Sequence, residues 1–313
     1  MTVKERLGML YILVGPGGVG KNALMRRVLK QVKDLCQLPT ATTRDPRADE
    51  QQGVQHLFVS VEEFKRMIDA GELLEHQEVH PDKFYGVPRA TVEDAIKGNQ
   101  DLIADIEYKG ATILRESYPE NTIAIFIAPP STAALVDRMN DRQDSHVDIR
   151  DRLNRMASEM LYAPLCDYIL VNSDFEAAVQ ALTRLVQETS LERDDIGSYL
   201  LHNNGHVSLE NVILVMSEGR LLVHDGQPMR VPLGHRESPV NMAHHAVAKL
   251  LSLPDDIVSQ SLIYGRPDDQ PPVKFSFDEQ DQHYTVTYFF TIEVDDIQAP
   301  HGWEWVEVER RST

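Results

Sequence analysis

One glycine-rich stretch, GPGGVGKNAL at residues 15–24, constrains the fold more than any other part of the sequence. It follows a continuously apolar run, MLYILV, and precedes ALMRRVLKQV, whose apolar residues recur at helical spacing. A buried strand, a glycine turn and a helix N-terminus present consecutive backbone N–H groups to a phosphate, and the lysine adds a positive charge. The stretch therefore predicts a phosphate-binding loop. Its residues are Gly15, Gly17, Gly18, Val19, Gly20, Lys21 and Asn22.

The end of this loop is unusual. The residue after the lysine usually supplies a hydroxyl group to Mg²⁺. Here Asn22 offers only a neutral amide oxygen, and Ala23 offers no ligand atom. The sequence thus predicts an intact phosphate cradle and leaves open how a metal would be held beside it.

Strands and helices alternate through the first part of the chain. Apolar runs at residues 101–107, 121–129 and 167–174 read as strands, and residues 60–76 read as a helix with an N-cap at Ser60 and Gly71 near its end. Alternation of this kind predicts an α/β fold of the P-loop type, with a mostly parallel sheet and helices on both faces.

The character of the sequence changes after residue 189. Residues 190–205 are polar and turn-rich, which indicates a linker between a first domain at 1–189 and a second at 206–313. The second domain begins with a hairpin pattern, NVILVMSEGRLLVHDG, and continues with a helical stretch and two β-rich segments. We expect a separate α+β domain.

Composition excludes some functions. The formal net charge of −18 argues against binding to nucleic acid or to anionic membranes, because such a surface repels phosphate backbones. No apolar run approaches the length of a membrane span, which is about 18 residues or more. The two cysteines, Cys36 and Cys166, indicate no disulfide framework. We expect a cytoplasmic protein.

The segment TATTRDPR at residues 40–47 places two arginines on a stiff turn around a proline. Planar guanidinium groups bind oxyanions bidentately, so Arg44 and Arg47 suit a phosphate or carboxylate. Taken alone, the segment is equally compatible with a solvated loop that makes surface ion pairs.

Several segments together resemble the guanylate kinases. The glycine loop, TTRDPR, GVQHLFVSVEEFKRMIDAGELLEH, FYGVPR, LIADIEYKGA, FIAPPS and DYILVNSDFEAA have the order and spacing of that family over roughly residues 9–187. The resemblance implies transfer of the γ-phosphoryl group from ATP to GMP with Mg²⁺, on a core that carries a GMP-binding lobe and a lid.

The resemblance also implies residue roles. ATP would be held by the glycine loop and by the segment of Asn172, and catalysis would use Lys21, Arg44, Arg142 and Arg152, the last two in the lid. The GMP site would contain Thr40, Arg44, Arg47, His56, Glu75, Tyr85 and Asp105. Asn22 and Glu107 would lie near the metal. Without the resemblance, Glu75 reads as a surface acid at a helix end and Asp105 as a cap at a strand end.

Three departures from the family pattern bear on activity. His56 stands where the family has a phosphate-binding tyrosine, and it can still donate a hydrogen bond. Val87 stands where a hydroxyl meets the guanine carbonyl, which removes one contact worth about 0.5–1.5 kcal/mol. Asn22 and Ala23 remove the hydroxyls after the lysine. Three interpretations follow. The first is an active guanylate kinase or a closely related nucleoside monophosphate kinase, the second is a weak or silent nucleotide-binding or scaffold protein, and the third is a kinase for another phosphorylated acceptor.

The second domain resembles a Nudix box at residues 231–253. Glu237 and Ser238 align with that pattern, but His245, Ala246, Lys249 and Leu250 replace its Arg-Glu pair and its paired glutamates. Because Mg²⁺ requires hard oxygen ligands, we expect a Nudix-like fold without Nudix hydrolysis. His244 and His245 point about 100° apart on a helix and are poor co-ligands. Such a domain would be regulatory or dimerising, which leaves a homodimer as an alternative to a monomer.

Overall fold

A computed structural model describes residues 6–48, 50–140, 155–189, 206–234, 236–266, 271–281, 283–295 and 297–308. The expected linker at 190–205 and the expected lid residues Arg142 and Arg152 lie outside these ranges. The domain boundary at 190–205 therefore stays a prediction.

The part of the chain that resembles the guanylate kinases, roughly residues 9–187, is called here the family-like part. A five-stranded sheet forms its centre, in the order β2-β7-β1-β8-β9. Its strands are β1 (Leu10–Val14), β2 (Leu35–Gln37), β7 (Asp101–Asp105), β8 (Thr122–Ala128) and β9 (Tyr168–Val171). The pairings of β1 with β7 and β8, and of β2 with β7, are parallel. Every residue of β1 and β8 is buried, as expected for parallel strands that are covered on both faces.

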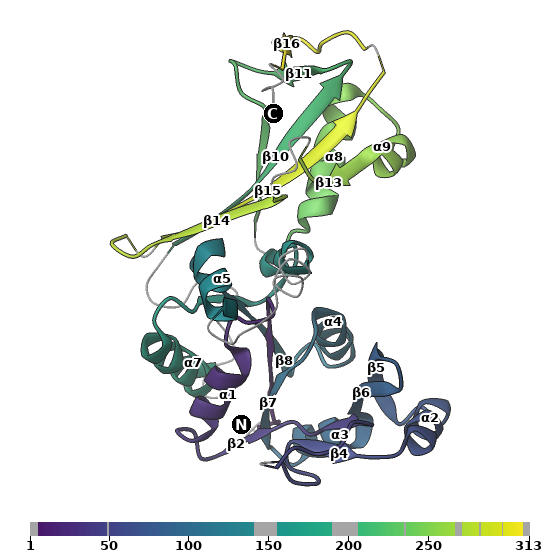
Figure 1. Cartoon of the computed structure of the whole chain (residues 1–313), viewed down its shortest axis with the longest axis vertical. Helices are drawn as coiled ribbons and strands as arrows, with labels where there is room; N and C mark the ends of the chain where they lie inside the picture. Colours follow the sequence, from purple (N-terminus) through teal and green to yellow (C-terminus); the bar gives the residue numbers. More distant parts are fainter. Residues whose placement is uncertain are drawn as a thin grey trace, which may run out of the picture. The chain divides into compact units, whose positions relative to one another are not determined.

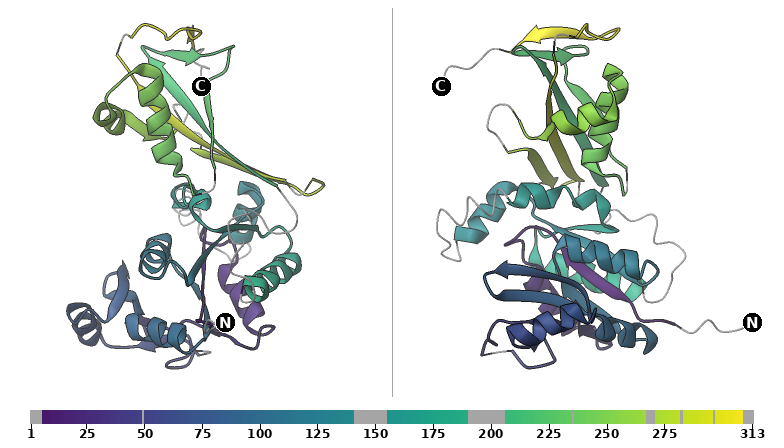
Figure 2. Two further views of the ribbon diagram at one scale, coloured as in Figure 1. Left: turned by 180° about the vertical axis from the view of Figure 1, so that it is seen from behind. Right: turned by 90° about the vertical axis from the view of Figure 1, so that its right-hand side faces the viewer.

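Helices cover both faces of this sheet. In Figures 1 and 2, α1 (Lys21–Leu29) and α7 (Phe175–Thr189) lie together on one face, and α4 (Tyr108–Ser117) lies on the other. The buried hydroxyl of Tyr11 in β1 donates to the carbonyl of Val186 in α7, which fixes that helix to the sheet. The predicted α/β architecture is confirmed. Two further helices of the family-like part are α3 (Arg89–Lys97) and α5 (Thr132–Asn140).

A second sheet has four strands in the order β4-β3-β6-β5. It carries the loop that contains Arg44 and Arg47. Its strands are β3 (Thr40–Thr42), β4 (His56–Phe58), β5 (Leu73–His80) and β6 (Lys83–Pro88). Helix α2 (Val61–Asp69) packs on it, and Phe64 and Met67 form a small core with Ala41 and Leu73.

The helix expected over residues 60–76 is shorter in the structure. Ser60 caps α2 by accepting from the backbone N–H of Glu63, as the sequence predicts. Gly71 then adopts a left-handed conformation, with φ of 66°, and the chain turns into β5 at Leu73. The segment GELLEH is therefore a turn and a strand, and Glu75 lies on that strand and not at a helix end.

The C-terminal part is a seven-stranded sheet in the order β13-β15-β10-β11-β16, with β12 beside β10 and β14 beside β15. Its strands are β10 (His206–Ser217), β11 (Arg220–Val223), β12 (Met229–Pro232), β13 (Leu262–Tyr264), β14 (Val273–Asp278), β15 (His283–Glu293) and β16 (Glu304–Glu307). The two long strands β10 and β15 are parallel, and the predicted hairpin of β10 and β11 turns at Glu218 and Gly219, both with positive φ. Its helices are α8 (Pro239–Leu251) and α9 (Asp255–Ser261).

By its internal contacts the chain forms two compact units. Unit 1 contains residues 1–15, 19–127 and 174–199, and unit 2 contains residues 16–18, 128–173 and 200–313. Segment 128–173 of the family-like part therefore belongs to the same unit as the C-terminal sheet. None of the helices in the described ranges is long and apolar enough to span a membrane.

Candidate active site

The glycine loop connects β1 to α1. Gly15, Gly18 and Gly20 have φ values of 131°, 90° and 103°, a region that L side chains rarely adopt. A Cβ atom on Gly15 would lie 2.4 Å from the carbonyl oxygen of Ile127. Gly20 is the N-cap of α1 and offers no side-chain acceptor, so the first N–H groups of the helix are left for an anion.

Lys21 lies over this loop. Its Nζ atom donates to the Gly15 carbonyl oxygen at 2.7 Å and is 3.8 Å from Oδ1 of Asp105, which ends the neighbouring strand β7. Burial raises the pKa of Asp105, and the nearby ammonium of Lys21 partly offsets that rise. The loop thus holds a positive charge beside backbone N–H groups, an arrangement that binds phosphates.

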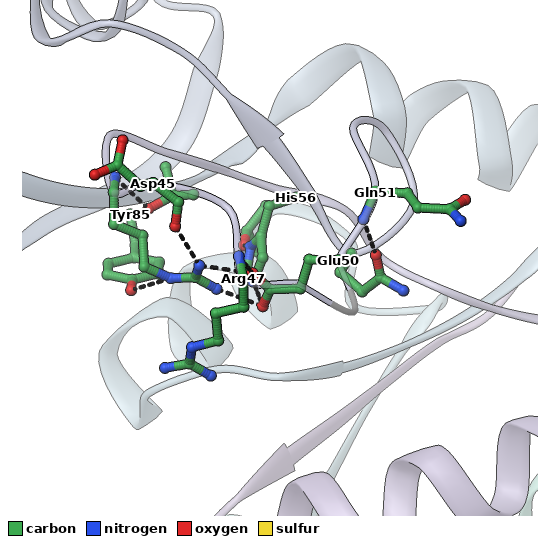
Figure 3. A network of polar contacts seen from close by, with 10 residues as sticks. Asp45, Arg47, Glu50, Gln51, His56 and Tyr85 are labelled. Carbon is green, nitrogen blue, oxygen red and sulfur yellow. Dashed lines mark hydrogen bonds and ion pairs between the residues drawn. The ribbon is translucent and has the colours of Figure 1, made fainter.

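Arg44 is the centre of a polar cluster beside the second sheet. Figure 3 labels Glu50, His56 and Tyr85 of this cluster. Its guanidinium group donates to both carboxylate oxygens of Glu50, at 2.7 and 2.6 Å, and its Nε atom donates to the hydroxyl of Tyr85 at 3.0 Å. His56 lies 3.8 Å from Glu50 through Nε2, and its Nδ1 atom is 2.8 Å from Oγ1 of Thr40. We call these five residues the arginine cluster.

Glu50 holds this cluster together, and the sequence reasoning missed it. Its side chain is only 5% exposed, and it also accepts from the backbone N–H of Arg47 at 2.9 Å. The hydrogen bond from Arg44 lowers the pKa of Glu50 to about 2, so the carboxylate stays ionised. The sequence signal for Glu50 is its position three residues after Arg47. An acid that becomes buried in a folded loop needs a cationic partner, and the arginines of this loop can supply one.

Arg47 and His56 lie beside this carboxylate, and His56 is the more buried of the two. Arg47 is exposed, and Figure 3 shows its guanidinium directed away from Glu50. Burial, followed by the charge of Arg44, lowers the pKa of His56. His56 is therefore neutral near pH 7 in the free protein. A bound phosphate would favour its protonated form.

Three acids gather on the side of β5 and α4. Glu75 on β5 and Asp105 at the end of β7 are partly buried, and Glu107 is the exposed N-cap of α4. Burial, and then the negative charge of Glu107, raises the pKa of Glu75 to about 7. Val87, the cross-strand partner of Glu75, is fully buried.

A family model described as guanylate kinase matches residues 8–189, which is more than half of the chain. The chain belongs to the guanylate kinase family. The guanylate kinase of Salinibacter ruber is 41% identical over 180 residues, which cover 57% of this chain and 95% of that protein. The guanylate kinase of Maricaulis maris is 38% identical, over 60% of this chain and 87% of that protein. A crystal structure of guanylate kinase from Anaplasma phagocytophilum is similar with 27% identity and a TM-score of 0.48, over 60% of this chain and 89% of that one.

The guanylate kinase pattern predicted Asn172 beside the adenine. Asn172 follows β9 and is buried, its backbone N–H donates to Ala128, and its carbonyl accepts from the guanidinium of Arg138 at 2.7 Å. Asn22 and Glu107, the predicted metal neighbours, are both exposed and carry oxygen atoms of the kind that Mg²⁺ binds. Among the described residues, no group of three or more His, Cys, Asp or Glu side chains is placed to hold a metal ion by itself.

Gly110 in the first turn of α4 provides the space for Glu75. A Cβ atom there would lie 2.9 Å from Cδ of Glu75 and 2.7 Å from Cγ2 of Ile106. Because the family resemblance implies that Glu75 binds guanine, we expect Gly110→Ala to displace the Glu75 carboxylate and to raise the KM for GMP about tenfold, the loss of one charge-assisted hydrogen bond. The KM for ATP should stay within twofold. Steady-state kinetics with each substrate varied in turn test this. Gly265→Ala is the control, because an added Cβ atom there would lie no closer than 3.6 Å to a neighbouring atom.

The raised pKa of Glu75 predicts a pH dependence. A carboxylate must be ionised to accept hydrogen bonds from guanine, so the KM for GMP should rise as the pH falls below about 7 and level off above pH 8. The same shift opposes folding. The folded state keeps a proton that the unfolded state has lost, so stability falls as the pH rises from about 4.5 to 7.

Glu75→Gln separates these two effects. It should weaken GMP binding at pH 8 and raise the free energy of unfolding there by roughly 1–3 kcal/mol, the cost of ionising a carboxyl with so raised a pKa. Urea unfolding at pH 5 and pH 8 measures the second effect. A stability gain of equal size at both pH values would contradict the assignment.

Proposed function

We propose that this chain transfers the γ-phosphoryl group of ATP to GMP and releases ADP and GDP. The observation that supports the proposal is that one guanylate kinase core contains two groups of cationic and N–H donors suited to oxyanions. One is the glycine loop with Lys21, and the other is the arginine cluster around Arg44. A kinase that joins two phosphorylated substrates needs a site for each of them.

In the proposed reaction, an oxygen of the GMP phosphate attacks the γ-phosphorus of ATP. A new P–O bond forms, the bond from that phosphorus to the β,γ-bridging oxygen breaks, and ADP leaves with the electron pair. Lys21 and the loop N–H groups hold the ATP phosphates, while Arg44, Tyr85 and His56 hold the GMP phosphate. Mg²⁺ that arrives with ATP would neutralise phosphate charge, with Asn22 and Glu107 as nearby oxygen donors.

Base selection is assigned to the acids near α4. Ionised Glu75 and Asp105 accept from the ring N–H and the exocyclic amine of guanine, a donor pair that adenine lacks. Thr40 offers a further hydroxyl, which His56 orients. The buried side chain of Val87 contributes shape but no hydrogen bond to the guanine carbonyl.

A coupled ADP-release assay with Mg·ATP and a panel of acceptors tests the proposal. Turnover with GMP, slower turnover with dGMP, and none with AMP, UMP or CMP is the expected pattern. No turnover with any acceptor, together with measurable nucleotide binding, would contradict the proposal and favour a silent nucleotide-binding or scaffold protein.

Asn22→Ser tests the unusual end of the loop. If the missing hydroxyl limits the metal-dependent step, the serine variant should raise kcat severalfold at low Mg²⁺, because it restores an oxygen ligand after the lysine. Titration of kcat against Mg²⁺ concentration measures this, with Ala23→Ser as the neighbouring control. Identical Mg²⁺ dependence in the variant and the parent would contradict the expectation.

For residues 206–313 we propose a Nudix-like domain without hydrolytic activity in a cytoplasmic protein. Helix α8 carries His245 and Lys249, and its N-terminal neighbour Glu237 accepts from the backbone N–H of Gly234 at 2.6 Å, which supports a structural role for that carboxylate. We also propose a homodimer formed through this domain, which light scattering would test by measuring the molar mass. Hydrolysis of nucleoside diphosphate derivatives should be undetectable and should not change in Glu237→Gln.

A further inference from the structure

Two buried tyrosines of β15 donate hydrogen bonds to the family-like part of unit 2. The hydroxyl of Tyr284 donates to the carbonyl of Pro129 at 3.1 Å, and that of Tyr288 donates to the carbonyl of Met160 at 2.9 Å. Both tyrosines have no exposed surface. A buried hydroxyl or carbonyl without a hydrogen-bond partner destabilises the folded state. These two hydrogen bonds therefore hold the carbonyls of Pro129 and Met160 in position.

The spacing of the two tyrosines gives β15 two anchor points on one face. Alternate residues of β15 are buried, so Tyr284 and Tyr288 point to the same face of the strand. Four residues along a strand span about 13 Å, which sets the separation of the two anchor points. Burial raises the pKa of both tyrosines well above the ordinary value, so each hydroxyl keeps its proton and stays a donor.

Two more residues of the C-terminal part hold the same region. Tyr264 in β13 donates to the carbonyl of Ala157 at 2.9 Å. Arg236 precedes α8 in a left-handed conformation, its backbone N–H donates to Pro164, and its guanidinium contacts the buried carboxylate of Asp167 at 2.6 Å. Together the four residues fix five polar groups of residues 129–167.

The anchored region carries the part of the proposed ATP side that contains Asn172. Asn172 and Arg138 lie in this region, and their hydrogen bond orders the end of β9. Residues 16–18 of the glycine loop belong to the same unit, whereas Gly15, Gly20 and Lys21 belong to unit 1. The arginine cluster, Glu75 and Asp105 also lie in unit 1.

We infer that the C-terminal sheet is a positioning element for ATP, with Tyr284, Tyr288 and Arg236 as positioning residues that act through residues 128–140 and 155–173. The inference rests on the proposed function, since it takes Asn172 and its surroundings as the ATP side. It gives the second domain a role that requires no catalytic glutamates. Loss of the anchors should therefore affect ATP and leave GMP binding unchanged.

The test uses the full chain and two kinds of variant. Tyr284→Phe/Tyr288→Phe removes both buried donors. Arg236→Gln removes the charge beside the buried carboxylate of Asp167 but keeps an amide N–H donor at a largely exposed position, so that variant should fold. Each should raise the KM for ATP about three- to tenfold, the equivalent of one or two lost hydrogen bonds. The KM for GMP should change less than twofold, and Arg236→Lys should restore part of the loss.

Two control variants show whether the effect is specific. Thr291→Val also removes a hydroxyl of β15 that donates to a backbone carbonyl, but its acceptor is Gly265 inside the C-terminal sheet. Arg230→Gln removes an arginine pair with Glu210 in the same sheet. Neither should change the KM for ATP. Equal rises in both KM values, or a rise in the controls as large as in the anchor variants, would overturn the inference.

Amide hydrogen exchange distinguishes this inference from the proposed function. In the anchor variants, residues 155–165 should exchange faster while residues 40–47 keep the protection of the parent chain. That readout does not depend on turnover. If the parent chain fails to phosphorylate GMP, the proposed function fails; if exchange at 155–165 is unchanged, the anchoring inference fails.

Discussion

Arg44→Met should lower kcat/KM for GMP by about 10²–10³-fold and the free energy of unfolding by about 3–5 kcal/mol, because it leaves a buried carboxylate unpaired. Glu50 is 5% exposed and receives two short hydrogen bonds from Arg44. The same guanidinium is the main cation of the proposed GMP-phosphate site. Steady-state kinetics and urea unfolding measure the two losses separately.

A second substitution should separate these losses. Arg44→Met/Glu50→Gln removes the unpaired charge, while the amide oxygen of the new side chain can still accept from the backbone N–H of Arg47. Most of the stability should therefore return, and the activity should not. Arg66→Met is the matched control. Arg66 pairs with Glu63 and Glu72 at an exposed site, where its loss should cost about 1 kcal/mol or less. Recovery of activity in the double variant would contradict the role given to Arg44.

Lys21→Met should lower kcat by about 10²–10³-fold with little loss of stability. Its ammonium group contacts a loop carbonyl and lies near Asp105, but it is not locked in a bidentate buried pair. The variant should still bind GMP, because the arginine cluster is unchanged. Isothermal titration with GMP and single-turnover kinetics with Mg·ATP test both statements.

Lys30→Met, at the C-terminal end of the same helix, is the control for loss of a lysine from α1. Its kinetics should match those of the parent chain. A Lys21→Met variant that retains more than about a tenth of the parent kcat would contradict a transition-state role for the ammonium group.

Local patterns predicted the parts of the fold that depend on neighbouring residues. The apolar run before the glycine loop became β1, and Ser60 capped α2 as its spacing to Glu63 indicates. The residues after Gly71 were misassigned because Glu and Leu favour helices, whereas pairing with β6 makes them a strand. Tertiary pairing overrode local propensity there.

Long-range contacts could not be predicted from such patterns. Glu50 becomes essential only when its loop folds back against Tyr85, 41 residues beyond Arg44 along the chain. The tyrosines of β15 are buried in the core, but their hydroxyls donate to carbonyls far away in the sequence. The roles proposed for Thr40, Glu75 and Asp105 came from the family resemblance. An isolated acid or hydroxyl on a strand does not by itself indicate that the residue binds a base.

The hydrogen bond from Tyr284 to Pro129 joins residues that are 155 positions apart. At a synthesis rate of about 5–20 residues per second, Tyr284 is synthesised roughly 8–31 s after Pro129. For that interval the nascent chain already contains both phosphate sites, but its ATP side lacks its support. A ribosome-bound chain that stops before residue 284 lacks both tyrosine anchors, so it should bind GMP but show a raised KM for ATP.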